Sequence, residues 1–243
     1  LLDAMAHGCA LRVPDVAASP SAAPGAAARW DHSGIQTAEL VVTLSECEAF
    51  PHPSERGQSL AKCARLVMSV REALIEASWA RAESWRPLVG ALKLGSRLLS
   101  PDEIHDLAEV SEARVELDDA RRSFETGVRE ALAKGRSLHI ADGKPWDHSG
   151  IDLGNLAAAT DELGAFPRAS DDGKKLVAEA RVALTVRAAL AQCDWEQAAS
   201  WRALLSALDI LPPEDLVYSE VAEARKELLD KQSAVIEKVR QEL

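Results

Sequence analysis

The sequence predicts an all-α protein made of tandem helical-hairpin repeats, and three observations support this. First, the segment Trp30-Asp31-His32-Ser33-Gly34-Ile35 returns at residues 146–151. Second, residues 30–92 and 146–208, compared without gaps at an offset of 116, share 28 identities in 63 positions, too many for chance. Third, 47% of residues are apolar but only 4% are aromatic, and the abundance of Ala, Leu, Glu and Arg favours helix.

The repeat divides the chain into three parts. Residues 3–13 align with residues 130–140, so we expect residues 1–29 to be the tail of a preceding repeat followed by a flexible Ala/Pro/Ser loop. Residues 30–145 form the first repeat unit and residues 146–243 the second, each unit of about 116 residues where it is complete. The expected neighbours of these units are further repeats of the same parent chain.

Each unit begins with a short and then a long helix. Ser33 and Ser149 are expected to cap short helices over 36–49 and 152–165, which end before the Phe-Pro pairs at 50–51 and 166–167. Long helices are expected over 54–77 and 171–192. In the first of these, apolar residues recur every three or four positions and form one buried stripe: Leu60, Cys63, Val67, Val70 and Leu74.

A second short and long helix complete each unit. Short helices are expected over 79–94 and 195–210, each with one apolar face. Ser100, Pro101 and Glu103 form a capping box that begins a long helix over 101–134. Its counterpart is expected over 213–243, after a shorter link.

The order of helices in each unit is therefore short, long, short, long. A Val-Arg-x-x-Leu motif at 70, 128, 186 and 239 is spaced by 58, 58 and 53 residues, so every unit is two helical hairpins. A lone hairpin cannot bury its apolar stripe, and stacked neighbours must cover it. The sequence thus predicts a helical bundle or a short α-solenoid.

Charge and cysteine content limit the classes of partner. The net charge is −11, with acids and bases interspersed and no basic stripe, so nucleic acid is not an expected partner. Membrane insertion is not expected either, because no run of about 18 apolar residues occurs. The four cysteines form no CxxC pair and do not recur between the copies, which indicates free thiols in a reducing compartment. We expect a cytoplasmic, cytoskeleton-associated protein whose partners are proteins of unknown identity.

The tryptophans and two arginines are the candidate anchors for packing or for partners. All six tryptophans fall into matched pairs, Trp30/Trp146, Trp79/Trp195 and Trp85/Trp201. They are expected to pack between hairpins; the alternative is an aromatic patch that faces a partner. Arg86 and Arg202 also recur, either as members of ion pairs or as part of an arginine row that recognises an acidic segment.

The sequence contains no recognisable catalytic or metal-binding motif. Asp31, His32 and Ser33 are adjacent, whereas the members of a catalytic triad meet from separate segments, so this motif is interpreted as a turn and helix cap. No cofactor is expected. The predicted function is a non-enzymatic scaffold that binds proteins through stacked helices. The alternative is a helical module with an apolar cavity lined by tryptophan, at 79, 85, 195 and 201, for a lipid-like or pigment-like ligand.

Overall fold

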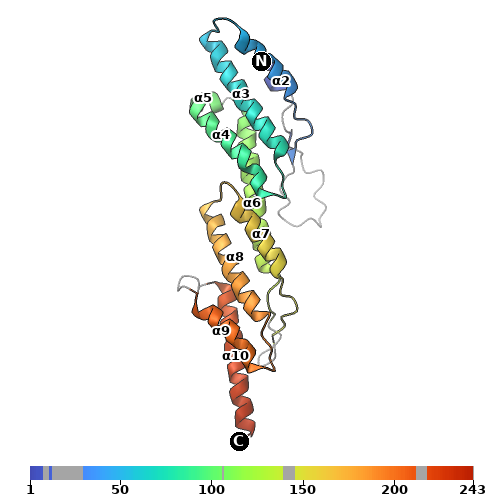
Figure 1. Cartoon of the computed structure of the whole chain (residues 1–243), viewed down its shortest axis with the longest axis vertical. Helices are drawn as coiled ribbons and strands as arrows, with labels where there is room; N and C mark the ends of the chain where they lie inside the picture. The colour runs from blue at the N-terminus through green and yellow to red at the C-terminus, as the bar shows by residue number, and fades with distance from the viewer. Residues whose placement is uncertain (8–10, 13–29, 106, 139–145, 212–217, 243) are drawn as a thin grey trace. The chain divides into compact units, whose positions relative to one another are not determined.

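A computed structural model shows a mostly helical chain, and this confirms the all-α class (Figure 1). The structure describes residues 1–7, 11–12, 30–105, 107–138, 146–211 and 218–242. Its strands are limited to β1 (Leu11–Arg12) and β2 (Trp30–Asp31), which pair antiparallel. The expected loop at 14–25 lies outside the described residues.

The contacts divide the chain into two compact units whose boundary differs from the repeat boundary. Unit 1 is Leu1–Phe124 with Ala165–Arg168, and unit 2 is Glu125–Gly164 with Ala169–Leu243. The division therefore falls inside a helix, not at the expected junction near residue 146. The reason is that the last turns of this helix pack with the hairpin that follows them, as shown by the 2.6 Å hydrogen bond from Ser170 Oγ to Glu125 Oε1.

The described residues of unit 1 include two clusters of buried side chains. One surrounds Trp85 and includes Val70, Leu88 and Leu117; the other joins Ala4 to Leu40 and its neighbours. The Ser54 hydroxyl accepts a hydrogen bond from Gly57 N and caps the long helix of this unit. The elements are α1 (Leu2–Ala6), α2 (Ala38–Ala49), α3 (Glu55–Glu76), the 3-10 turn η1 (Ala82–Trp85), α4 (Arg86–Leu98), α5 (Pro101–His105) and the first part of α6 (Ala108–Ala133).

Unit 2 has a core around Trp201, formed with Val186, Leu204 and Val221. Ser170 caps its long helix by accepting from Gly173 N at 2.8 Å, as Ser54 does in unit 1. The elements are the end of α6, most of α7 (Leu153–Ala165), α8 (Asp171–Leu190), the 3-10 turn η2 (Ala198–Trp201), α9 (Arg202–Asp209) and α10 (Ser219–Glu242).

The prediction that Ser33 and Ser149 are helix caps is wrong. The Ser33 backbone N–H donates to Asp31 Oδ1 at 2.9 Å, and Ser149 does the same to Asp147. Each aspartate thus closes a local turn before the helix, as short polar side chains commonly do. The helices begin only at Ala38 and Leu153.

The predicted starts of the second short helices are also too early. Residues 78–81 and 194–197 form turns, each closed by a bridge, and helix α4 begins at Arg86 and α9 at Arg202. The indole N–H of Trp85 donates to Ser78 O at 3.0 Å, and that of Trp201 donates to Asp194 O at 2.9 Å. These hydrogen bonds stabilise the two turns, which would be lost if the helices began earlier.

The predicted helix over 101–134 occurs as two pieces, α5 and α6, and the expected start of its counterpart at 213 lies outside the described residues. The capping box before α5 is confirmed. Ser100 N donates to Glu103 Oε2 at 2.8 Å, and Glu103 N donates to Ser100 Oγ at 3.4 Å.

Candidate functional site

A buried arginine joins three segments of unit 1. Arg71, on α3, is 1% exposed, and its Nε and Nη2 donate to the two carboxylate oxygens of Glu109 at 2.8 and 3.1 Å. Nη1 donates to Gln36 O at 2.7 Å and Nη2 to Met5 O at 2.8 Å. Arg71 therefore ties the carbonyl end of α1, the approach to α2 and the start of α6 to one side chain. We call this set of contacts an arginine clamp.

Unit 2 contains an arginine clamp made by the aligned residue. Arg187, on α8, is also 1% exposed and pairs with Glu220 at the start of α10. Its Nη1 and Nη2 donate to Ala131 O and Leu132 O, at 3.2 and 2.8 Å, at the end of α6. Gly135 follows with φ of +67°, where a Cβ would lie 3.2 Å from Arg187 Nη1. The tight left-handed turn after α6 thus requires glycine.

A histidine–glutamate pair accompanies each clamp. His32 Nε2 lies 2.6 Å from Glu116 Oε1, and His148 Nε2 makes the same hydrogen bond with Glu227. Both carboxylates are fully buried. Glu109 and Glu116 are seven residues apart, as are Glu220 and Glu227, which places each pair on one face of its helix, two turns apart.

These contacts explain why the Asp-His-Ser motif recurs. The histidine fixes the turn before α2 or α7 to the last long helix of the unit, and the aspartate closes that turn. The pKa of Asp31 is lowered by its hydrogen bonds with the hydroxyl and backbone N–H of Ser33. Within the described ranges no group of three or more His, Cys, Asp or Glu side chains is arranged to hold a metal ion.

The tryptophans lie in or beside the unit cores. Trp85 is fully buried and Trp201 is 4% exposed; each meets a second indole edge-on, Trp79 at 5.5 Å and Trp195 at 5.4 Å between ring centroids. Trp146 is buried, and its Nε1 donates to Asp230 Oδ2 at 3.4 Å. Trp30 is half-buried.

The two candidate arginines are placed differently from the clamp arginines. Arg86 and Arg202 are the first residues of α4 and α9, and both are exposed. Neither makes an ion pair with any described residue. They are available to a partner, whereas the side chains of Arg71 and Arg187 are buried and hydrogen-bonded within the fold.

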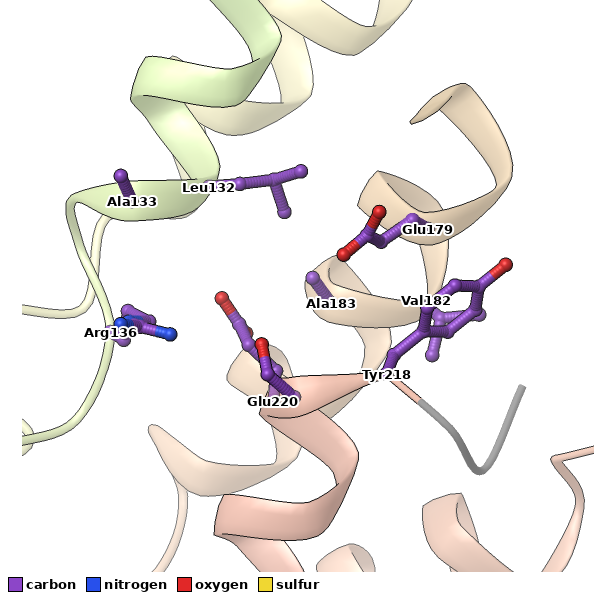
Figure 2. Close-up of a pocket in the computed structure, with 9 residues that line it drawn as sticks. Leu132, Ala133, Arg136, Glu179, Val182, Ala183, Tyr218 and Glu220 are labelled. Carbon is purple, nitrogen blue, oxygen red and sulfur yellow. The ribbon is translucent and has the colours of Figure 1, made fainter. Parts of the chain in front are cut away.

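Unit 2 contains a polar hollow of about 240 Å³ next to its clamp. Figure 2 shows Leu132, Ala133 and Arg136 on one side of it, and Glu179, Val182 and Tyr218 on the other. Glu220 also lines it but is held by Arg187. In unit 1 the residue aligned with Glu179 is Cys63, which is buried in the core. The Glu179 carboxylate in this lining is therefore specific to the second copy.

A second hollow in unit 2 is mainly apolar and has a volume of about 390 Å³. Leu205 and Ile236 remain 45% and 54% exposed within it. We call it the α9–α10 groove, and it is lined by Ala198, Trp201, Arg202, Leu205, Leu228, Lys231, Gln232, Val235 and Ile236. Sequence reasoning identified Trp201 and Arg202 but not the groove.

The described cysteines are free thiols: Cys47, Cys63 and Cys193. Burial, together with the charge of Glu227, raises the pKa of Cys193 to about 12. A thiol with so high a pKa is a poor nucleophile at neutral pH.

Nowhere in the described part of the chain is there a helix with the length and apolar character needed to cross a membrane. Comparisons of the chain with protein-family models, with curated proteins and with solved structures found no match.

Proposed function

We propose that the chain is a non-enzymatic scaffold segment, built of tandem helical-hairpin repeats, that binds proteins through the surfaces of its stacked helices. The duplicated arginine clamp carries this proposal. Arg71 and Arg187 hold the carbonyl end of one helix against the hairpin that follows it, and bind a glutamate from the next long helix. Within each compact unit, such a device joins segments that come from successive sequence repeats.

The aligned contacts support a repeating arrangement. Met5 aligns with Leu132 when residues 3–13 are set against 130–140, and these two residues supply the carbonyls bound by the two clamps. Helix α1 thus has in unit 1 the role that the end of α6 has in unit 2. Stacking of this kind generates a bundle or a short α-solenoid with extended binding surfaces.

The exposed side chains favour a protein partner. Apolar residues remain exposed along α9 and α10, notably Leu205, Leu229 and Ile236. Apolar surface next to charged residues is typical of protein interfaces. The acidic net charge disfavours nucleic acid. We infer a cytoplasmic location, since free thiols that are not part of the repeat are typical of a reducing compartment.

The proposal can be tested by affinity capture with the full chain as bait, read by mass spectrometry. Leu205→Glu would alter the exposed α9–α10 groove, and Ile75→Glu, at an exposed residue of α3, is the matched control. A discrete protein set that survives moderate salt and is lost only with Leu205→Glu is the expected result. Capture of chaperones alone by all three proteins would overturn the scaffold function.

The α9–α10 groove also favours a second candidate function, that of a helical module for an apolar ligand such as a lipid. Trp201 lines this groove and would report occupancy. Tryptophan emission would be recorded during titration with lipid vesicles and with detergent below its micelle concentration. A blue shift that Leu205→Glu removes supports this candidate, and unchanged emission excludes it.

A further inference from the structure

A contact within unit 1 shows how a phenylalanine can fill the surface between a short and a long helix. Phe166 directly follows α7, belongs to unit 1 and is only 4% exposed. Its ring lies 5.7 Å from that of Phe124 on α6. Phe166 belongs to the same core cluster as Trp85, Val89 and Leu117, a cluster to which both α4 and α6 contribute.

Residues aligned with members of this cluster line the open α9–α10 groove. Helices α4 and α9 align at the offset of 116, while α6 and α10 align at 111, the offset at which Glu109 matches Glu220 and Glu116 matches Glu227. With these offsets Trp85, Val89, Leu117 and Phe124 correspond to Trp201, Leu205, Leu228 and Val235, all of which line the groove.

The aligned residues are more exposed in unit 2, although Val89 and Leu117 also line a hollow of about 600 Å³ in unit 1. Val89 is 6% exposed and its counterpart Leu205 is 45% exposed. Val235, the counterpart of Phe124, is 37% exposed. The groove therefore offers unit 2's version of the Phe166 site without a phenylalanine in it.

The residue aligned with Phe166 is Phe50, and it is 66% exposed. Both phenylalanines directly follow a short helix and precede a proline. Phe50 lines a hollow of about 530 Å³ at the junction of α2 and α3, together with Glu46 and His52. Exposing most of a phenylalanine side chain to water is unfavourable relative to burying it.

We propose that Phe50 of one copy of this chain inserts into the α9–α10 groove of a second copy, between Trp201, Leu205 and Val235. The interface reproduces the contact that Phe166 makes with α4 and α6. Phe50, the knob of this contact, and the groove are different surfaces of the same chain, so the contact is heterologous. A pair of copies therefore still has one free knob and one free groove. Successive copies then assemble head to tail.

Charge also favours a second copy as the occupant. The charged residues of α2, which ends beside Phe50, are all acidic: Glu39, Glu46 and Glu48. The groove is lined by Arg202 and Lys231, and Arg202 makes no ion pair with any described residue. Glu46 and Arg202 would flank the inserted phenylalanine, and complementary charges at a rim promote association and fix orientation.

The inference names a partner for the proposed scaffold and rests on that function. It is tested with the full chain by sedimentation velocity and light scattering from micromolar to near-millimolar concentration. The variants are Phe50→Glu, which removes the knob, and Leu205→Glu, which blocks the groove. Ile75→Glu is the control, and all three replace exposed side chains, so circular dichroism is expected to show unchanged folding.

The wild type and the control are expected to show a mass that rises with concentration beyond the 26.1 kDa of one chain. Each of the other variants alone remains a monomer. Their equimolar mixture forms a dimer and nothing larger, because one supplies an intact knob and the other an intact groove. A wild type that remains monomeric, variants that still associate, or a mixture that stays monomeric would overturn the proposal.

The same variants separate this proposal from the scaffold function. Phe50→Glu keeps the groove and the rest of the surface, so in the capture experiment it still retains other partners if the chain is a scaffold. If the chain retains other partners but does not self-associate, only the proposed head-to-tail contact is refuted. If the chain neither captures other partners nor self-associates, the proposed scaffold function is refuted as well.

Discussion

Arg187 and Glu220 form a buried ion pair whose guanidinium also binds the last carbonyls of α6. One side chain on α8 therefore holds two other helices of unit 2. The two opposite charges compensate each other, so removal of either residue leaves a buried charge without a partner.

Replacement of Arg187 by Ala is expected to lower the free energy of unfolding by about 3–5 kcal/mol, because the buried carboxylate of Glu220 then lacks its guanidinium partner. Urea denaturation followed by circular dichroism measures this loss. Arg181→Ala, at an exposed residue of the same helix, is the control and should change stability by no more than about 0.5 kcal/mol. Similar losses in the two variants would contradict the structural role of the clamp.

The clamp also shows where prediction from sequence stopped. Arg71 and Arg65 lie on the same helix and recur in both copies, yet Arg71 is buried while Arg65 is exposed and pairs with Glu48. Periodicity predicts which face of a helix is apolar but not which arginine finds a buried carboxylate on another helix. That distinction depends on contacts between distant segments.

The partner glutamates were missed for a different reason. Glu109 and Glu220 are separated by 111 residues, and the comparison used an offset of 116. The shorter third spacing of the Val-Arg motif, 53 instead of 58, carries the same five-residue change and was the signal that could have found them. The helices themselves were predictable from apolar periodicity. The turn before α2 was not, because Asp31 Oδ1 accepts from the Ser33 backbone N–H and the helix begins only at Ala38.

Replacement of His148 by Ala is expected to destabilise the protein by about 1–3 kcal/mol, since Oε1 of the fully buried Glu227 loses its hydrogen-bond partner. Thermal unfolding by calorimetry measures the effect. Lys134→Ala, which removes a side chain that is 76% exposed, is the control. If His148→Ala and the control unfold at the same temperature, the histidine does not hold its turn to α10.

Glu103 is expected to make stability depend on pH in the acid range. Hydrogen bonds from the Ser59 hydroxyl and from Ser100 lower the pKa of Glu103 from 4.5 to about 2. A carboxylate with a depressed pKa in the folded state stabilises the fold above its unfolded pKa. That contribution is lost as the pH falls from about 4.5 to about 2.

The measurement is the midpoint of urea denaturation at a series of pH values for the wild type and for Glu103→Gln. The wild type is expected to be the more stable at neutral pH, and the difference should shrink below pH 4.5. The matched control is Asp102→Asn, which changes the same charge next to Glu103. A constant difference between the wild type and Glu103→Gln across the acid range would refute the assignment.

Phe166 and Phe50 occupy aligned positions but are expected to respond differently to truncation. Phe166→Ala removes a buried ring packed on Phe124 and should cost about 3–5 kcal/mol of unfolding free energy. Phe50→Ala removes an exposed ring, so in dilute monomer its effect should stay within about 0.5 kcal/mol. Urea denaturation at low micromolar concentration compares the two.

At high concentration, where head-to-tail contacts bury Phe50, truncation of Phe50 should also lower stability, because association stabilises the folded state. Equal effects of the two truncations in dilute solution would mean that Phe50 is already covered within the monomer, and the α9–α10 groove would then need another occupant.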